Sequence, residues 1–443
     1  MIDEKISIGK SQQTYQRAKE IIPGGTQLLS KRPEMFLPDL WPAYYDNSEG
    51  CRVWDLDGRE YIDAAYMGVG ANVLGYCNEA VDNAVIDSIK RGTNTTLNAP
   101  EEVELAEVLL GLHPWADSVR YTRTGGEAMA VAVRIARAKT GKEKVLFCGY
   151  HGWHDWYISS NLAEDKLKNG HLIPGLEPNG VPQSLINTAL PFTYNNTQEF
   201  LDLIANHGDE VGAVVVESVR NFEPEDGFFE TLMSVTRERG IVLILDEITA
   251  GFRLNIGGAH LRYGIKPDIA VFGKAFSNGY PMAAIVGVKE VMEAAQTSFI
   301  SSLFWTERTG LAAALATIRE MQRIDSPSKV MELGVLLQKT WKEISERTGV
   351  PIKVMGMPAI SAFAIEHPNA LACKTFLTQE MLKKGYLATT AFYVSCAHES
   401  ELDGYFEALE SVFAQLGGMI KDGIDPETRL EGPVCHSGFK RLT

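Results

Sequence analysis

Residues 268–282, DIAVFGKAFSNGYPM, combine a short apolar run with a glycine, a lysine and a turn-rich end. An apolar run of this length predicts a buried β-strand that is covered on both faces. Lys274 follows that strand directly after Gly273. Most lysines at strand ends are ordinary surface side chains, whereas a lysine amine held in a partly desolvated pocket is a nucleophile. The neighbouring strands decide between these two interpretations.

Five further apolar runs predict strands. They are SVRYT (118–122), KVLFCG (144–149), GAVVVE (212–217), IVLILDE (241–247) and MAAIVG (282–287). Segments with helical periodicity, among them residues 126–141 and 228–240, separate several of these runs. Buried strands that alternate with helices predict an α/β fold with a mostly parallel sheet. Right-handed crossovers then bring the carboxyl ends of the strands, and the ligands, to one edge of the sheet.

The two ends of the chain differ from its middle in their pattern of predicted strands and helices. Residues 51–64, CRVWDLDGREYIDA, predict short strands around a hairpin-type turn. A long helix begins near residue 326 and is followed by short strands and more helices. We therefore expect a large α/β domain over residues 76–325, and a smaller α+β domain built from residues 1–75 and 326–443.

Composition argues against several classes of protein. The chain has 443 residues and a net charge of −15, which disfavours nucleic acid or an anionic membrane surface as a partner. The polar start MIDEKISIGKSQQTYQ contains no signal peptide, and no apolar run is long enough to span a bilayer. The six cysteines include no CxxC pair and no spacing typical of zinc. We expect a cytoplasmic protein with reduced thiols and without a metal site.

Asp246 ends the apolar run VLILD, one strand–helix–strand step before Lys274. A carboxylate at the end of a buried strand either caps the next turn or meets a cation, because an unpaired buried charge is costly. In a parallel sheet Asp246 and Lys274 lie at the same edge. In the functional interpretation, Asp246 is the counter-charge of a protonated ring nitrogen.

The segment RTGGEA (123–128) joins a predicted strand to a predicted helix. Gly125 and Gly126 let the backbone approach a ligand closely, and Thr124 offers a hydroxyl. The helix N-terminus adds free N–H groups and a positive dipole end. Such junctions are common in α/β proteins, but this one is also suited to hold a phosphate.

Two more strand ends carry candidate side chains. Tyr150 follows the run KVLFCG and can stack on a planar ring, and Glu217 ends the run AVVVE. A phosphate cradle, a stacking aromatic, an anion for a ring nitrogen and an amine for an aldehyde are what pyridoxal 5′-phosphate (PLP) requires. The sequence therefore predicts a PLP enzyme in which Lys274 forms the Schiff base.

These residues resemble the class III PLP-dependent aminotransferases of fold type I, and within them the glutamate-1-semialdehyde aminomutase-like branch. The resemblance runs roughly from residue 21 to residue 413. It rests on VWDLDGREYIDA, TGGEAMAVAVRIARAKTGKEKVLF, GYHGWHD, LILDEITAGFR and KPDIAVFGKAFSNGYPMAAIVG. It implies the PLP-transferase fold, with Lys274 as the Schiff-base lysine and Asp246 on the pyridine nitrogen. It also implies that Tyr150 and His151 bind the cofactor ring.

The family further implies a homodimer with active sites at the subunit interface. A loop of the neighbouring subunit completes the phosphate site, and the matching stretch here is FISSLFWTERTG (299–310). Leu303 stands where the family usually has Thr. The resemblance therefore assigns the phosphate-binding hydroxyl to Ser302, with Ser301 and Thr306 as alternatives.

Three departures from the family bear on the substrate. Lys31, followed by Arg32, stands where the aminomutases have an arginine. Residues 387–398 lack the carboxylate segment of the aminomutases and the substrate-binding arginine of ornithine-type members. Ser218 replaces the usual Pro, and Arg220 follows as an extra cation. We expect an acidic substrate to meet Lys31, Arg32 and Arg220.

The favoured function is a ping-pong aminotransferase that moves an amino group from an amino-acid donor to a carbonyl acceptor, a keto acid or a keto-sugar. One alternative is a glutamate-1-semialdehyde-type 2,1-aminomutase, with the polar segment 159–180 as its lid. The other is a non-catalytic protein that binds a ligand on the same fold. The sequence leaves the donor, the acceptor and the pathway open.

Overall fold

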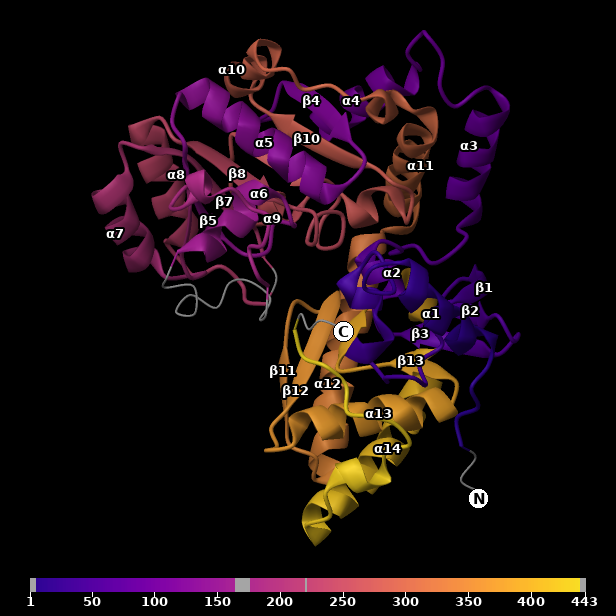
Figure 1. Ribbon diagram of the computed structural model, residues 1–443. Coiled ribbons are helices and arrows are strands. Elements are labelled where there is room, and N and C mark those ends of the chain that lie inside the picture. The colour runs from indigo at the N-terminus through magenta and orange to yellow at the C-terminus, as the bar shows by residue number, and fades with distance from the viewer. Residues whose placement is uncertain (1–4, 164–175, 220, 439–443) are drawn as a thin grey trace. The chain divides into compact units, whose positions relative to one another are not determined.

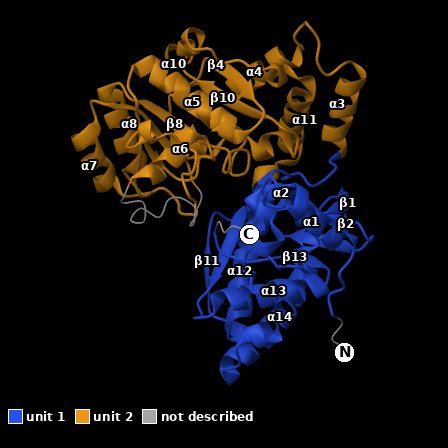
Figure 2. Ribbon diagram, in the orientation of Figure 1, with its two compact units in different colours: residues 1–78, 328–443 blue, residues 79–327 orange. Residues whose placement is uncertain are grey.

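The computed structural model describes residues 5–163, 176–219 and 221–438 (Figure 1). The chain divides into two compact units (Figure 2). Unit 1 comprises residues 1–78 and 328–443, and unit 2 comprises residues 79–327. In the part of the chain that is described, no helix has both the length and the apolar character needed to cross a membrane.

Unit 2 is built on a seven-stranded sheet in the order β4-β10-β9-β8-β7-β5-β6. The strands are β4 (Ser118–Thr122), β5 (Lys144–Cys148), β6 (Ala189–Pro191), β7 (Val211–Glu217), β8 (Val242–Asp246), β9 (Ile269–Phe272) and β10 (Ala283–Gly287). Strands β5 to β9 pair in parallel, whereas β10 runs antiparallel to both β4 and β9. The predicted α/β fold is confirmed, and each of the six predicted strands matches to within one residue at either end.

The two faces of this sheet are both buried, which explains why its strands are apolar throughout. Helix α5 (Gly125–Thr140) packs on one face and helix α8 (Phe228–Arg239) on the other. Successive strand residues alternate between the two cores. Val145, Phe147, Val215 and Ile244 lie in the core with α5, while Leu146, Val214, Leu243 and Leu245 lie in the core with α8.

Unit 1 combines both ends of the chain. Strands β2 (Arg52–Asp55) and β3 (Glu60–Ala64) form the antiparallel hairpin that the DLDG turn predicts. Strand β13 (Tyr386–Ala388), from the far end of the sequence, pairs in parallel with β3. A second sheet has the order β11-β12-β14. Its strands are β11 (Ile352–Met355), β12 (Ile360–Ile365) and β14 (Ala391–Tyr393). The long helices from this end of the chain are α12 (Ser326–Thr348), α13 (Ala370–Lys383) and α14 (Leu402–Asp422).

Candidate active site

The carboxyl ends of neighbouring parallel strands bring the predicted residues together at one edge of the unit 2 sheet. Glu217, the last residue of β7, pairs in register with Asp246, the last residue of β8. Asp246 in turn pairs with Val271 of β9, three residues before Lys274. Parallel pairing with short crossovers therefore places these strand ends side by side, as the sequence predicts.

Lys274 begins a short 3-10 helix, Lys274–Ser277, immediately after β9. Its backbone has a φ of 49°, in the left-handed region that a residue other than glycine seldom occupies. Its Nζ donates a hydrogen bond of 2.9 Å to Oγ1 of Thr249. A conformation of this kind costs about 1–3 kcal/mol and persists only where the surrounding structure enforces it. The fold therefore holds the Lys274 amine in a defined place.

Asp246 is a buried carboxylate with only 3% of its surface exposed. Its Oδ1 accepts from the backbone N–H of Ile248 at 2.9 Å, and its Oδ2 lies 2.8 Å from Nδ1 of His151. The other ring nitrogen of His151, Nε2, lies 3.1 Å from the carbonyl oxygen of Cys148. Because a carboxylate oxygen only accepts, Nδ1 is the nitrogen that donates, to Asp246. Each carboxylate oxygen keeps a second lone pair, so Asp246 can accept from a further cation.

Helix α5 supplies the predicted phosphate cradle. Thr124 is its N-cap, and its hydroxyl accepts from the N–H of Glu127, whose carboxylate accepts in return from the N–H of Thr124. This reciprocal capping box explains Glu127 without a catalytic role. The helix begins at Gly125, so the N–H groups of its first residues have no acceptor within the helix.

The glycines of this junction are required by close contacts. A Cβ at Gly125 would lie 2.8 Å from Cδ1 of Ile248, and a Cβ at Gly126 would lie 2.8 Å from Cε1 of His154. A Cβ at Gly273 would also meet Ile248, at 3.5 Å. The Ile248 side chain thus lies beside both the start of α5 and the turn that carries Lys274. The start of α5 and the turn that carries Lys274 are therefore close neighbours.

Tyr150 and Glu217 lie at the same edge and contact each other. The backbone N–H of Tyr150 donates to Oε2 of Glu217 at 3.3 Å, and Glu217 is buried. The Tyr150 ring is 39% exposed, and its centroid lies 6.0 Å from that of Tyr157 in an edge-on arrangement. Glu217 thus supports the backbone of the turn that carries the partly exposed Tyr150 side chain.

These residues fit PLP. The cofactor needs an anchored phosphate, an anion at its ring nitrogen and an amine at its aldehyde carbon. The N-terminus of α5, the buried Asp246 carboxylate and the Lys274 amine offer these three groups within one sheet edge. Because a Cβ at Gly125 or Gly126 would meet Ile248 or His154, the start of α5 keeps its backbone free of side chains at these two positions.

The segment predicted to serve a neighbouring subunit is largely on the surface. Ser302 precedes a 3-10 helix, Leu303–Thr306, and the Thr306 hydroxyl donates to the carbonyl of Leu303 at 2.8 Å. Leu303 and Phe304 are each 64% exposed. The arginines Arg120 and Arg134 hold the preceding stretch through the carbonyls of Ile300 and Phe299. The described contacts of this segment do not include Lys274 or Asp246.

Two of the three predicted substrate cations belong to unit 1, and the third lies outside the described residues. Lys31 and Arg32 belong to unit 1, where Lys31 ends the 3-10 helix Leu29–Lys31 and is exposed. Arg220 lies outside the described residues, and so does the stretch 164–175 within the predicted lid at 159–180.

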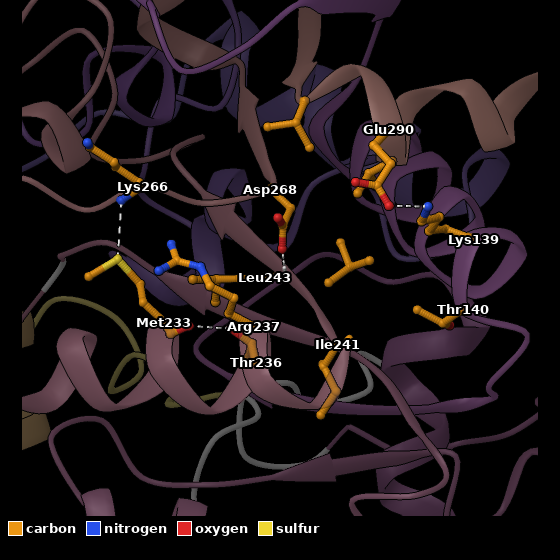
Figure 3. Close-up of a pocket in the computed structure, with 14 residues that line it drawn as sticks. Lys139, Thr140, Met233, Thr236, Arg237, Ile241, Leu243, Lys266, Asp268 and Glu290 are labelled. Atoms are coloured by element: carbon orange, nitrogen blue, oxygen red, sulfur yellow. Dashed lines mark hydrogen bonds and ion pairs between the residues drawn. The ribbon is translucent and has the colours of Figure 1, made fainter.

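A separate cavity of about 400 Å³ opens at the opposite edge of the sheet, where β8 and β9 begin (Figure 3). Asp268 lies in it and accepts from the N–H of Leu243 at 2.8 Å, and burial raises the pKa of this carboxyl. The nearby Lys139 is paired with Glu290 at 2.6 Å. This cavity is formed by strand starts and helix ends, so it is distinct from the edge that holds Lys274.

Sequence reasoning missed the turn that follows Asp246. The side chains of Ile248 and Thr249 contact the two halves of the site, Ile248 beside Gly125 and Thr249 at Lys274. The residues ITAG directly follow the strand-end DE in the sequence. A turn sequence, however, does not indicate which distant residues its side chains contact. The buried pair formed by Glu247 and His260, 2.8 Å apart, was missed for the same reason.

Comparison with known proteins agrees with this geometry. The family model described as aminotransferase class-III matches residues 38–395. The 3-aminobutyryl-CoA aminotransferase of Cloacimonas acidaminovorans (strain Evry) is 32% identical over 386 residues, covering 85% of this chain and 88% of that protein. The glutamate-1-semialdehyde 2,1-aminomutase of Methanothermobacter thermautotrophicus is 31% identical over 433 residues, covering 92% and 99%.

A solved structure also matches over nearly the whole chain. The FumI protein of Sphingopyxis sp. MTA144, in its PLP internal aldimine form, has a TM-score of 0.83 and 26% sequence identity. The match covers 95% of this chain and 100% of FumI.

Proposed function

The chain belongs to the class-III aminotransferases and is a PLP-dependent aminotransferase, and from that premise we propose which of its residues do the work. Lys274 is the lysine that carries the cofactor, and Asp246 is the partner of the ring nitrogen. Thr124, Gly125 and Gly126 bind the phosphate. The observation that carries this proposal is that the Lys274 turn, the buried Asp246 and the start of α5 meet at one sheet edge.

The surrounding residues have supporting roles. His151 donates to Asp246 and keeps this carboxylate oriented toward the ring nitrogen. A buried charge-assisted hydrogen bond of this kind is short and strong. Tyr150 covers one face of the ring, and Glu217 holds the backbone of Tyr150 by accepting from its N–H.

When bound, PLP supplies an aldehyde carbon for the amine and a cationic ring that draws electrons from the substrate. Asp246 holds the proton on the ring nitrogen, because a carboxylate beside it stabilises the cationic form. Lys274 would hold the aldehyde carbon of the cofactor, and in its free form its amine would move the proton at the substrate Cα as a general base and acid. The same groups work in reverse on the carbonyl acceptor, which gives a ping-pong cycle.

We also propose that the enzyme is a cytoplasmic homodimer and that Ser302 or Thr306 of one subunit reaches the phosphate of the other. The exposed side chains of Phe299, Leu303 and Phe304 support this, because contiguous exposed apolar surface is typical of interfaces. All six cysteines are free thiols, which fits a reducing compartment.

The substrates are proposed from chemistry alone. Arg220 is our candidate for the donor carboxylate, and Lys31 and Arg32 are candidates for an acidic group of the acceptor. Lysine is a point charge and binds a carboxylate less rigidly than arginine does. We therefore favour a keto-sugar, held mainly by neutral hydrogen bonds, as the acceptor, with a keto acid as the alternative. The name of the 3-aminobutyryl-CoA relative adds β-amino compounds to the donors worth testing.

A half-reaction screen tests the proposal. The PLP-loaded enzyme is mixed with one amine at a time, and the loss of its visible absorption band is followed together with release of the keto product. We expect at least one amino acid to bleach the band and release its keto acid. Conversion of glutamate-1-semialdehyde to 5-aminolevulinate without release of a keto acid would instead support the aminomutase alternative.

A further inference from the structure

We infer that Thr249 is a positioning residue that holds the free amine of Lys274 beside the cofactor. This inference rests on the proposed role of Lys274 and adds a partner for it. The hydroxyl Oγ1 of Thr249 lies 2.9 Å from Nζ of Lys274, within hydrogen-bonding distance. Thr249 itself is only 7% exposed. The contact is therefore partly buried, and a hydrogen bond to a charged group is worth more there than at the open surface.

The backbone of Thr249 is held on both sides. Its carbonyl accepts from Nε of Arg253 at 2.9 Å, and Arg253 is buried. On the other side, the carbonyl of Glu247 accepts from the N–H of Gly251 at 2.7 Å, which closes the turn around Thr249.

The Glu247 side chain is an anchor for this turn. Its carboxylate accepts from the N–H groups of Ala259 and His260, at 3.1 and 2.7 Å, and from Nδ1 of His260 at 2.8 Å. Nε1 of Trp115 donates to Nε2 of His260 at 3.1 Å, so the proton of this imidazole lies on Nδ1, facing Glu247. This fully bonded network fixes the turn that presents Thr249.

Lys274 meets Thr249 with an equally restricted backbone. Its left-handed φ of 49° limits where the side chain can start, and Thr249 fixes where the amine ends. Two constrained ends confine a side chain that otherwise has four rotatable bonds. Such confinement lowers the entropic cost of bringing the amine to the reacting carbon.

A hydroxyl suits this task because it both donates and accepts. It accepts from the ammonium form of Lys274 and donates to the lone pair of the neutral amine. Lys274 alternates between these forms as it takes a proton from the substrate Cα and returns it. Valine has the same shape as threonine but offers neither function, whereas serine offers both.

The test compares Thr249→Val and Thr249→Ser, with Thr236→Val as a matched control. Thr236 is also buried and its hydroxyl also makes a hydrogen bond, which it donates to the carbonyl of Leu232, but it lies on α8 at the opposite edge of the sheet. The first readout is the rate at which cofactor-free protein captures added PLP, seen as growth of the visible band. The second is the deuterium isotope effect on the donor half-reaction with a donor labelled at Cα.

We expect Thr249→Val to slow PLP capture and the donor half-reaction by about tenfold to a hundredfold, since a hydrogen bond to a charged group is lost. The isotope effect should rise, because proton transfer becomes more rate-limiting. Thr249→Ser should recover wild-type rates to within about threefold, and Thr236→Val should match wild type. If the valine variant lowers the melting temperature strongly, the smaller Thr249→Ala carries the same comparison.

Wild-type capture rates and isotope effects in both hydroxyl-free variants would overturn the inference. That result would leave the proposed function standing if Lys274→Ala still abolished the visible band. Retention of the band and of turnover in Lys274→Ala would instead refute the proposed function itself. The two failures are thus distinguished within one set of variants.

Discussion

The imidazole of His151 lies 2.8 Å from the carboxylate of Asp246, and both side chains are almost completely buried. A buried carboxylate that already has one donor from a histidine and another from a backbone N–H is held in a single orientation. The pair therefore fixes a negatively charged carboxylate at the end of strand β8, and a ring cation can bind to it.

The first prediction concerns the charge of the Asp246 carboxylate. Asp246→Asn should keep the fold but lose the charge that holds a proton on the ring nitrogen. Loss of one partner of a buried charge pair costs roughly 3–5 kcal/mol, which corresponds to a fall in kcat of about two to four decades. Stopped-flow rates of the donor half-reaction measure the effect.

Asp268→Asn is the matched control for this substitution. Asp268 is also a largely buried carboxylate next to β9, but it lies at the opposite edge (Figure 3). Its asparagine variant can still accept from the N–H of Leu243 and should retain wild-type rates. An effect of Asp246→Asn no larger than that of the control would mean that Asp246 only caps its turn.

The strands and the Asp246–Lys274 pair were predictable because both follow from local patterns. Buried parallel strands are apolar runs, and their polar ends stand out in the sequence. Strand β6 was missed because Ala189–Pro191 is too short to show a pattern. Thr249 was missed because its role depends on a contact with Lys274, 25 positions away in sequence. No local periodicity encodes such a contact.

A second prediction concerns acid stability and rests on His398 of unit 1. Its Nδ1 accepts from the N–H of Ser395 at 3.0 Å and its Nε2 faces the carbonyl of Asp63 at 2.9 Å, which is the neutral tautomer. Complete burial lowers the pKa of His398 below its ordinary value of 6.5. The unfolded chain therefore binds a proton more readily than the folded one.

This difference in proton binding makes the folded state less stable at low pH. The stability that His398 contributes is fully present above its unfolded pKa of 6.5 and is lost as the pH falls from there toward the lower folded pKa. The urea concentration at the midpoint of unfolding of the wild-type protein should therefore decrease as the pH is lowered below 6.5. His398→Gln can make both hydrogen bonds without titrating, so its stability should change less over the same range. Parallel pH curves for the two proteins would contradict this account.

A third prediction links the cofactor to assembly. If Ser302 or Thr306 reaches the phosphate of a partner subunit, PLP binds the dimer and not the monomer, and mass action makes the loaded dimer tighter. Sedimentation of a dilution series should show the cofactor-free protein dissociating at higher concentration than the loaded one. Identical dissociation curves would argue against a shared phosphate site.

A variant on the exposed surface supplies the control for assembly. Leu303→Glu places a charge among exposed apolar side chains that we assign to the interface. It should shift the loaded protein toward monomer, because an unpaired charge in an apolar contact is costly. Val335→Glu, at an exposed apolar residue of helix α12 in unit 1, should leave the dimer intact.

A fourth prediction concerns specificity. With Lys31 in place of the arginine found in aminomutases, an α-carboxylate should be held loosely. Keto-sugars should therefore be better acceptors than glutamate-1-semialdehyde or simple keto acids under matched conditions. Lys31→Arg should improve KM for acidic acceptors more than for neutral ones. An equal change in KM for acidic and neutral acceptors would mean that Lys31 does not bind the substrate.

The central claim is that Lys274 carries the cofactor, and one measurement addresses it directly. The PLP-loaded enzyme is reduced with borohydride, digested and sequenced by mass spectrometry, with Lys274→Ala treated in parallel. We predict one pyridoxyl-modified peptide with the label on Lys274 and no label in the variant. A label on any other lysine of the wild-type protein, or an unchanged label in Lys274→Ala, would contradict the account.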